Sequence, residues 1–173
     1  GKLPANPMLE GMLAADADPS SSFVFEHELI TFLAAGAESS AATMSWVCHV
    51  LATNPALQEK LRREAQAFWA SGDANWARLS GMPSFSALID ETLRIFPPTP
   101  LIARLSNGAD QIGTHAILQD QNVLISFVGI QNNMQLRADP WVVDLEKGIE
   151  KGGDKGGDKG GETAFGFGPR ICG

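Results

Sequence analysis

Apolar residues recur at helical spacing along much of the first half of the chain. A long periodic segment covers residues 26–53 and includes a nearly continuous apolar stretch from Leu29 to Ala37. Asn54-Pro55 then interrupts the pattern, because proline has no amide hydrogen for a helix interior and suits the first position of a new helix. The pattern therefore predicts two consecutive helices, over 26–53 and 55–70.

A third helix and short strands follow. Residues 83–96 are periodic up to Pro97-Pro98, and proline prevents the helix from continuing. Beyond the prolines, residues 101–105 and 123–130 have strand-like composition and are separated by a turn-rich stretch. The order of these elements predicts a mainly α fold with a few short β-strands.

The last part of the chain has a different composition. Ten of the 18 glycines lie between Gly148 and Gly173, and residues 151–162 repeat a Lys-Gly-Gly-acid tetrapeptide. Ordering so many glycines without side chains to bury costs too much backbone entropy, so the repeat predicts a solvated linker. We expect one incomplete domain (1–173) with four segments: an irregular lead-in over 1–25, a core of helices and short strands over 26–146, the linker over 147–162 and a final loop over 163–173.

Composition and charge narrow the class of protein. The chain has 173 residues, enough for one ordinary core, and a formal net charge of −7. An acidic chain has no basic field to attract phosphate backbones, so nucleic-acid binding is not expected. No apolar run approaches the roughly 20 residues that span a bilayer. Cys48 and Cys172 are too few for a secreted disulfide scaffold, which favours a reducing intracellular compartment.

The final loop holds the most specific chemistry. Residues 165–173 read Phe-Gly-Phe-Gly-Pro-Arg-Ile-Cys-Gly. A cysteine thiolate on haem iron favours O–O cleavage, provided that backbone N–H donors steady its sulfur. Glycines let such a loop turn tightly beneath a flat macrocycle, and an arginine can pair with a haem propionate. A lone cysteine is more often a small buried hydrophobic residue, but the whole constellation favours a ligand.

Phe165, Gly168, Arg170 and Cys172 fill the pattern Phe-x-x-Gly-x-Arg-x-Cys, which resembles the haem-binding signature of the cytochromes P450. The resemblance implies haem b as cofactor, Cys172 as the axial ligand of its iron and Arg170 as a propionate partner. It begins near Glu26 and implies a partial P450 fold, with a long I-type helix, J- and K-type helices, short strands and a haem-binding loop.

A second motif lies within the long helix. Ala35-Gly36-Ala37-Glu38-Ser39-Ser40 resembles the oxygen-binding Ala-Gly-x-Glu/Asp-Thr-Thr of the family. Gly36 leaves room for a flat cofactor, and Ser39 can turn its hydroxyl onto a backbone carbonyl. An isolated Glu38 is normally a solvated carboxylate, but its apolar surroundings favour a buried acid that relays protons with Ser39. Serine also lacks the methyl group that helps to fix the rotamer of the family's threonine.

Glu91 and Arg94 in the third helix stand three residues apart, so their side chains share a face and can form a pair. Such a pair is by itself commonly a surface salt bridge. Followed by Pro97-Pro98, it resembles the family's Glu-Thr-Leu-Arg-x-x-Pro-Pro element, whose role is structural. Arg104, in the predicted next strand, fits the family's second propionate-binding arginine.

The chain departs from the family pattern before the final loop. The family has a Pro-Glu-Arg-Phe/Trp element whose arginine completes a triad with Glu91 and Arg94, and Arg137 or Lys147 is a poor substitute on sequence grounds. Without that arginine we expect weaker packing around the pair and impaired haem retention. A complete family domain is much longer than this chain, so we expect a fragment without the roof of the distal pocket.

The resemblance implies a haem-thiolate monooxygenase that inserts one oxygen atom of O₂ into an organic substrate, with electrons from NAD(P)H through a P450 reductase or a ferredoxin. The remaining pocket lining, which includes Leu33, Ala34, Ala37 and residues 99–102, is mainly apolar and favours a lipophilic substrate. Two alternatives stay open: a P450-like lyase or peroxygenase that takes peroxide, and an inactive fragment or pseudoenzyme. An N-terminal anchor of the parent enzyme in the endoplasmic reticulum membrane also stays open.

Overall fold

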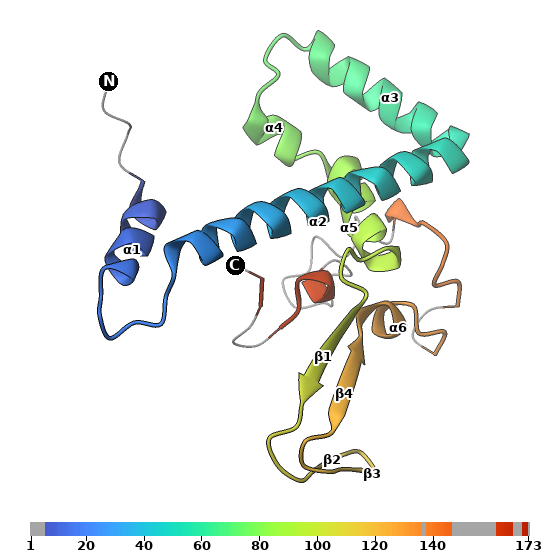
Figure 1. Ribbon diagram of the computed structural model, residues 1–173. Helices are drawn as coiled ribbons and strands as arrows, with labels where there is room; N and C mark the ends of the chain where they lie inside the picture. The colour runs from blue at the N-terminus through green and yellow to red at the C-terminus, as the bar shows by residue number, and fades with distance from the viewer. Residues whose placement is uncertain (1–5, 136–137, 147–161, 168–170, 173) are drawn as a thin grey trace. The chain divides into compact units, whose positions relative to one another are not determined.

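The computed structural model describes residues 6–135, 138–146, 162–167 and 171–172 (Figure 1). Helices dominate the described residues and strands are few, which confirms the predicted fold class. The chain divides into two compact units, Gly1–Ala41 and Ala42–Gly173. Apart from Glu162, the predicted linker over 147–162 lies outside the described residues.

The first unit begins with a helix that the apolar pattern does not predict. Helix α1 spans Pro7–Asp16, so the expectation of an irregular lead-in over 1–25 is wrong there. The Asn6 side chain caps the helix by accepting a hydrogen bond from the Leu9 amide at 3.2 Å, and Pro7 occupies the first position. An Asn-Pro signal for a helix start was therefore present here too.

Helix α2 spans Phe25–Thr53, close to the predicted 26–53, and it is continuous across the boundary between the two units. Every residue from 31 to 40 is solvent-exposed, including the apolar ones. In the described part of the chain, no helix combines the length and the apolar character that crossing a membrane requires.

Local polar contacts hold the connection between α1 and α2. The Asp16 carboxylate accepts a hydrogen bond from the Phe25 amide at 2.9 Å and so fixes the start of α2. Within the connection, the backbone N–H and then the hydroxyl of Ser20 donate to Asp18 and hold the pKa of that carboxyl below its usual value. These contacts join near neighbours in the sequence.

The second unit begins its own helices at Pro55, as the sequence predicts. Helix α3 spans Pro55–Ala70 and buries Leu61 and Phe68, which confirms its predicted amphipathic character. Helix α4 spans Trp76–Ser80 and was not predicted, because five residues are too few to show a helical period.

Helix α5 spans Pro83–Ile95 and is the most deeply buried element of the second unit. Phe96 leaves the helical conformation, with φ −126° and ψ 62°, as expected of a residue that precedes proline. Its ring instead stacks on Trp46 of α2, with centroids 4.1 Å apart and planes 3° from parallel. This stack joins the C-terminal half of α2 to the end of α5.

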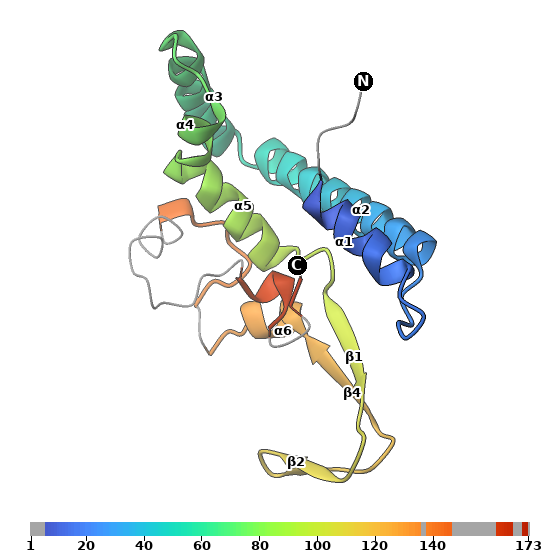
Figure 2. The same cartoon turned by 90° about the vertical axis from the view of Figure 1, so that its left-hand side faces the viewer.

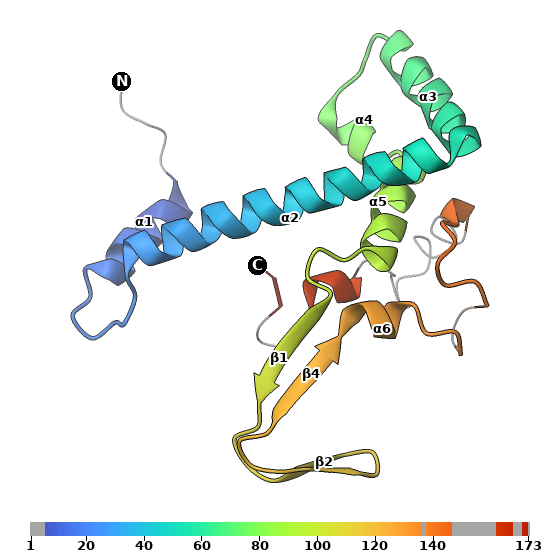
Figure 3. The same cartoon turned by 45° about the vertical axis from the view of Figure 1, so that its right-hand side comes forward.

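Four strands form two antiparallel pairs: β1 (Leu101–Leu105) with β4 (Asn122–Ser126), and β2 (Asp110–Ile112) with β3 (His115–Ile117). Figure 3 shows β1 and β4 side by side. In this pair Ile102 lies opposite Ile125. Gly113, with φ +60°, makes the turn between β2 and β3.

The predicted strand over 123–130 is wrong in its second half, which is helix α6 over Phe127–Gln131. Ser126 caps that helix through the Gly129 amide at 3.0 Å.

The core of the second unit joins segments that are far apart in the sequence. Its buried cluster contains Val50, Leu61, Ala87, Leu88 and Leu145. Helix α5 also contacts α6 and the 3-10 helix η1, which spans Glu162–Phe165 (Figure 2). Helix α5 is therefore the element around which the final loop, α6 and the core assemble.

Candidate functional site

A backbone hydrogen bond joins the two described parts of the final loop. After η1, Gly166 takes φ +75°, a left-handed conformation that favours glycine. The Cys172 amide then donates to the Phe165 carbonyl at 2.9 Å. The Phe165 side chain is 50% exposed, and Cys172 is exposed and forms no disulfide. The loop therefore presents the residue predicted as the iron ligand at its surface.

An aromatic contact fastens this loop to α6. Phe127 is 2% exposed and meets Phe167 edge to face, with ring centroids 6.1 Å apart and an interplanar angle of 83°. Gly166 lies beside the same ring, since an added Cβ there would come within 3.9 Å of it. The sequence analysis missed this contact, because it placed Phe127 in a strand. Gly168 and Arg170, the other predicted cofactor-binding residues of the loop, lie outside the described residues.

Glu91 and Arg94 form a buried ion pair in the last turns of α5. Their side chains are 4% and 1% exposed. The geometry is bidentate, because Arg94 Nε meets Glu91 Oε1 at 2.7 Å and Nη2 meets Oε2 at 2.8 Å. The alternative of a surface salt bridge is therefore wrong for this pair.

Groups from later in the chain complete the pair. Besides Glu91, three oxygens of the described residues accept hydrogen bonds from Arg94: Asn132 Oδ1 at 3.0 Å, the Pro140 carbonyl at 2.5 Å and the Val142 carbonyl at 3.2 Å. The Asp144 amide donates to Glu91 Oε2 at 3.2 Å. No buried side-chain nitrogen or oxygen among the described residues lacks a partner. The candidate substitutes Arg137 and Lys147 lie outside the described residues, so weaker packing around the pair and impaired haem retention stay predictions.

Arg104 lies in β1, the strand in which the sequence analysis placed it. Its guanidinium is solvent-exposed and donates to the Ala103 carbonyl of the same strand at 2.9 Å. Arg104 also lines a hollow of about 250 Å³ between β1 and the β2–β3 hairpin. An exposed guanidinium of this kind can reach a carboxylate of a bound ligand.

The motif around Gly36 lies on a fully exposed stretch of α2 in the first unit. Ser39 Oγ donates to the Ala35 carbonyl at 2.7 Å, the hydrogen bond that its position in a helix allows. A Cβ added at Gly36 would meet no atom within 4 Å. Glu38 is exposed, so the expectation of a buried carboxylate is wrong. Apolar neighbours in the sequence predicted burial, but Leu33 itself is 65% exposed.

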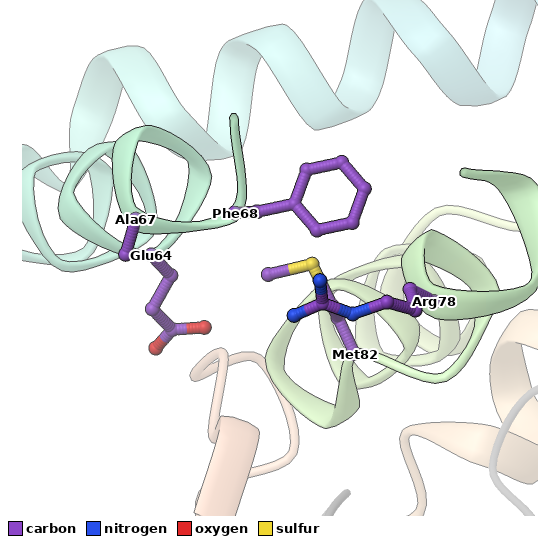
Figure 4. Close-up of a pocket in the computed structure, with 5 residues that line it drawn as sticks. All are labelled: Glu64, Ala67, Phe68, Arg78 and Met82. Atoms are coloured by element: carbon purple, nitrogen blue, oxygen red, sulfur yellow. The ribbon is translucent and has the colours of Figure 1, made fainter. Parts of the chain in front are cut away.

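A second hollow, of about 300 Å³, lies between α3, α4 and the start of α5, and the sequence analysis did not anticipate it. Figure 4 shows the five residues that line it: Glu64, Ala67, Phe68, Arg78 and Met82. Arg78 lies over the Phe68 ring at 5.7 Å and forms an ion pair with Asp73. Glu64 accepts a hydrogen bond from Ser84 at 3.1 Å. Both charged groups of this hollow are therefore already engaged by the chain.

The described residues fit a haem group in two respects. An exposed cysteine is the donor that a haem-thiolate site requires, and here a closed loop carries it. The face of α2 at Gly36 offers open space that any larger side chain would occupy. Cys172 and Gly36 belong to different compact units. The donor at Cys172 and the open space at Gly36 are therefore two separate observations.

Comparison with known proteins gives consistent matches. The sequence profile described as Cytochrome P450 matches residues 10–173. Cytochrome P450 4X1 of Rattus norvegicus is 33% identical over 141 residues, which cover 79% of this chain and 28% of the rat protein. Taurochenodeoxycholic 6 alpha-hydroxylase of Sus scrofa is 34% identical over 115 residues, 65% of this chain and 23% of the pig protein. The chain thus spans less than a third of the length of these relatives.

Solved structures agree with the sequence relatives. A crystal structure of a cytochrome P450 superposes with a TM-score of 0.78 at 25% identity and covers 99% of this chain and 41% of that chain. A zebra fish cytochrome P450 solved with abiraterone gives a TM-score of 0.77 at 21% identity, over 98% of this chain and 42% of that chain, which shows the fold alone. The predicted partial P450 fold is confirmed. With a profile that matches nearly its whole length, the chain belongs to the cytochrome P450 family.

Proposed function

We propose that this chain is part of a haem-thiolate monooxygenase in which Cys172 ligates the haem iron. The observation that carries the proposal is the backbone hydrogen bond of 2.9 Å that joins Cys172 to Phe165 while the cysteine stays exposed. Haem bound through a thiolate supplies cleavage of the O–O bond of dioxygen, and one oxygen atom enters the substrate.

Other residues of the chain bind the haem propionates, shape the loop and transfer protons. The exposed guanidinium of Arg104, together with Arg170, binds the two propionates by charge-assisted hydrogen bonds. Phe165 and Gly168 shape the loop around the ligand. The Ser39 hydroxyl, which donates to the Ala35 carbonyl, passes protons to the site from Glu38. The exposure of Glu38 supports this role, because a carboxylate in contact with water can be reprotonated from solvent.

The substrate is a lipophilic organic molecule. The segments proposed to line the pocket carry apolar side chains that are now exposed, including Leu33 at 65% and Leu101 at 52%. Two relatives that match this chain, from Sus scrofa and Eschscholzia californica, are named hydroxylases, which supports oxygen insertion as the reaction class. Electrons from NAD(P)H arrive through a P450 reductase or a ferredoxin, in a reducing intracellular compartment that keeps Cys172 a thiol.

A spectrum tests the ligand. Haem is titrated into the purified chain, and the absorption of the reduced, CO-bound form is recorded for the wild type, Cys172→Ala and Cys48→Ala. Cys48 is the matched control, because it is the other exposed cysteine. We expect a thiolate-type Soret band in the wild type and in Cys48→Ala, and its loss in Cys172→Ala. The same band in Cys172→Ala, or no haem uptake by the wild type, contradicts the proposal.

A second variant tests the face of α2. Gly36→Ala and the control Gly11→Ala, in α1, both add a methyl group where no atom lies within 4 Å, so neither strains the protein. Each should raise helix stability by about 0.5–1 kcal/mol. Only Gly36→Ala should weaken haem uptake, because only that methyl enters the space proposed for the cofactor. Equal uptake by the two variants contradicts a cofactor at Gly36.

Turnover separates the remaining alternatives. A parent enzyme that oxidises a lipophilic substrate with NAD(P)H and a reductase is a monooxygenase. If peroxide gives product and NAD(P)H with a reductase does not, the enzyme is the lyase or peroxygenase, which needs no redox partner. A protein that takes up haem and turns over with neither is the inactive alternative.

A further inference from the structure

The Arg94 guanidinium lies in the second unit's interior, where every donor requires an acceptor. Arg94 is 1% exposed, and water is therefore a poor substitute for a lost partner. Glu91 takes two of the donors, on Nε and Nη2. The remaining terminal nitrogen, Nη1, donates to Asn132 Oδ1 and to the Pro140 carbonyl. Glu91 thus binds the Nε and Nη2 side of the guanidinium, whereas Asn132 and Pro140 bind Nη1.

The Asn132 carboxamide is held in place to accept the hydrogen bond from Arg94 Nη1. It is 7% exposed and caps the C-terminus of α6. Its Nδ2 donates to the Val128 carbonyl at 3.0 Å and to the Arg94 carbonyl at 3.4 Å. Since a carbonyl only accepts and a guanidinium only donates, these contacts allow one orientation of the carboxamide. Asn132 therefore forms hydrogen bonds with both the backbone and the side chain of Arg94.

Arg94 in turn holds the segment over residues 140–145. It donates to the carbonyls of Pro140 and Val142, and its partner Glu91 accepts from the Asp144 amide. The next residue, Leu145, is 6% exposed and packs in the hydrophobic core. A rotation of the guanidinium would break contacts at both ends of this segment, which is separated from α5 by more than 40 positions in the sequence.

We propose that Asn132 is a positioning residue: its carboxamide oxygen holds the Arg94 guanidinium in the orientation that clamps the 140–145 segment onto α5. Asn132 acts through Arg94, which it contacts at both the side chain and the backbone. The consequence for haem rests on the proposed function, because this segment precedes the Cys172 loop in the chain. The clamp itself is independent of haem.

Hydrogen exchange of the Asp144 amide measures the clamp directly, because that amide donates to the clamped pair. The chain is compared with Asn132→Leu, which removes the acceptor but keeps a branched side chain, and with Asn133→Leu. Asn133 is the matched control, since it is the exposed neighbour and its Oδ1 accepts only a local bond from the Gln135 amide among those described. Loss of a buried partner of a charged donor predicts exchange that is faster by about tenfold to a hundredfold in Asn132→Leu. The control should change it less than about twofold.

Asn132→Asp separates positioning from mere space filling. Aspartate keeps an oxygen for Arg94 in either protonation state but loses the Nδ2 donor to Val128 and to the Arg94 carbonyl. If the acceptor is what matters, Asn132→Asp retains slow exchange at Asp144 while Asn132→Leu loses it. Fast exchange in Asn132→Asp, or equal exchange in Asn132→Leu and Asn133→Leu, overturns the proposal. Should Asn132→Leu fail to fold by circular dichroism, Asn132→Ala, which also lacks the acceptor oxygen, is compared with Asn133→Ala in its place.

Haem titration of the same variants separates this inference from the proposed function. If the wild type takes up no haem, the proposed function fails, whereas the exchange result for Asn132 stands. If the wild type takes up haem, Asn132→Leu should lose it faster than Asn133→Leu does. Equal haem retention, with fast exchange confined to Asn132→Leu, would keep the clamp and reject its role at the haem loop.

Discussion

Two Glu-x-x-Arg pairs occur on neighbouring helices of the second unit. On α3, Arg62 Nη1 meets Glu59 Oε2 at 3.0 Å, and the side chains are 54% and 49% exposed. On α5, Arg94 Nε meets Glu91 Oε1 at 2.7 Å, and the side chains are 1% and 4% exposed. The spacing is identical and the distances are similar, but one pair faces solvent and the other lies in the interior.

Burial changes what each pair contributes. An exposed pair is screened by water and salt, and it gains little because two long side chains must be ordered. A buried pair carries a large desolvation cost, which its mutual attraction and further hydrogen bonds offset. The α5 pair has those further bonds, from Asn132 and the backbone of residues 140–144. Spacing in a sequence therefore predicts that a pair forms, whereas its surroundings decide whether the fold depends on it.

Arg94→Ala should have the largest effect on stability. It leaves the Glu91 carboxylate buried without its bidentate partner, so we expect a loss of about 3–5 kcal/mol in the free energy of unfolding. Arg62→Ala, the matched control at the same spacing on α3, should lose at most about 0.5 kcal/mol. Urea denaturation followed by circular dichroism measures both.

The comparison would break if the two arginine variants lost similar stability. If Arg94→Ala cannot be purified, Glu91→Gln is measured against Glu59→Gln, because a neutral amide is a milder loss that keeps the side-chain shape. A buried pair then still predicts the larger loss at the α5 position, and equal losses would show that burial does not set the worth of these pairs.

Leu61→Ala sharpens the comparison by testing the buried face of α3, the helix whose exposed face carries the Glu59–Arg62 pair. Leu61 lies between Glu59 and Arg62 in the sequence but is 4% exposed and belongs to the core. Truncation of a buried leucine removes apolar contacts and leaves a cavity, which costs about 2–5 kcal/mol. The control Leu33→Ala, at 65% exposure on α2, should change stability by less than about 0.5 kcal/mol. Thermal unfolding by calorimetry measures both, and a small loss for Leu61→Ala would show that α3 is not anchored to the core.

Local signals made much of the fold predictable. Asn54-Pro55 marked a helix start, and Pro97-Pro98 marked the end of α5 to within one residue. Predictions failed where a pattern was short or ambiguous: a run of apolar residues from 123 to 130 fits a strand and a short helix equally well, and Ser126 as a cap decided between them. Helix α1 was missed although Asn6-Pro7 gave the same signal as Asn54-Pro55.

The candidate site was predictable as a set of residues but not as a set of contacts. Motifs identified Cys172, Arg104 and the Glu91–Arg94 pair. They gave no sign of Asn132, because an asparagine after an apolar run is read as a turn residue, nor of the backbone carbonyls that complete the pair. The burial of Glu38 was wrongly expected, since a run of apolar neighbours indicates burial only where the chain supplies something to cover them.

The smallest predicted effect concerns the two arginines that share Glu59. Arg62 and Arg63 approach its two carboxylate oxygens at 3.0 and 3.6 Å, so either one can replace the other. Each single change to alanine should cost at most about 0.5 kcal/mol, and the double variant should cost more than the sum, because only it removes both partners. At 1 M salt the Debye length falls to about 3 Å, so this excess should vanish, whereas the loss in Arg94→Ala should persist. An additive, salt-independent loss at α3 would instead assign the effect to packing of the arginine stems, and charge would then matter only for the buried pair.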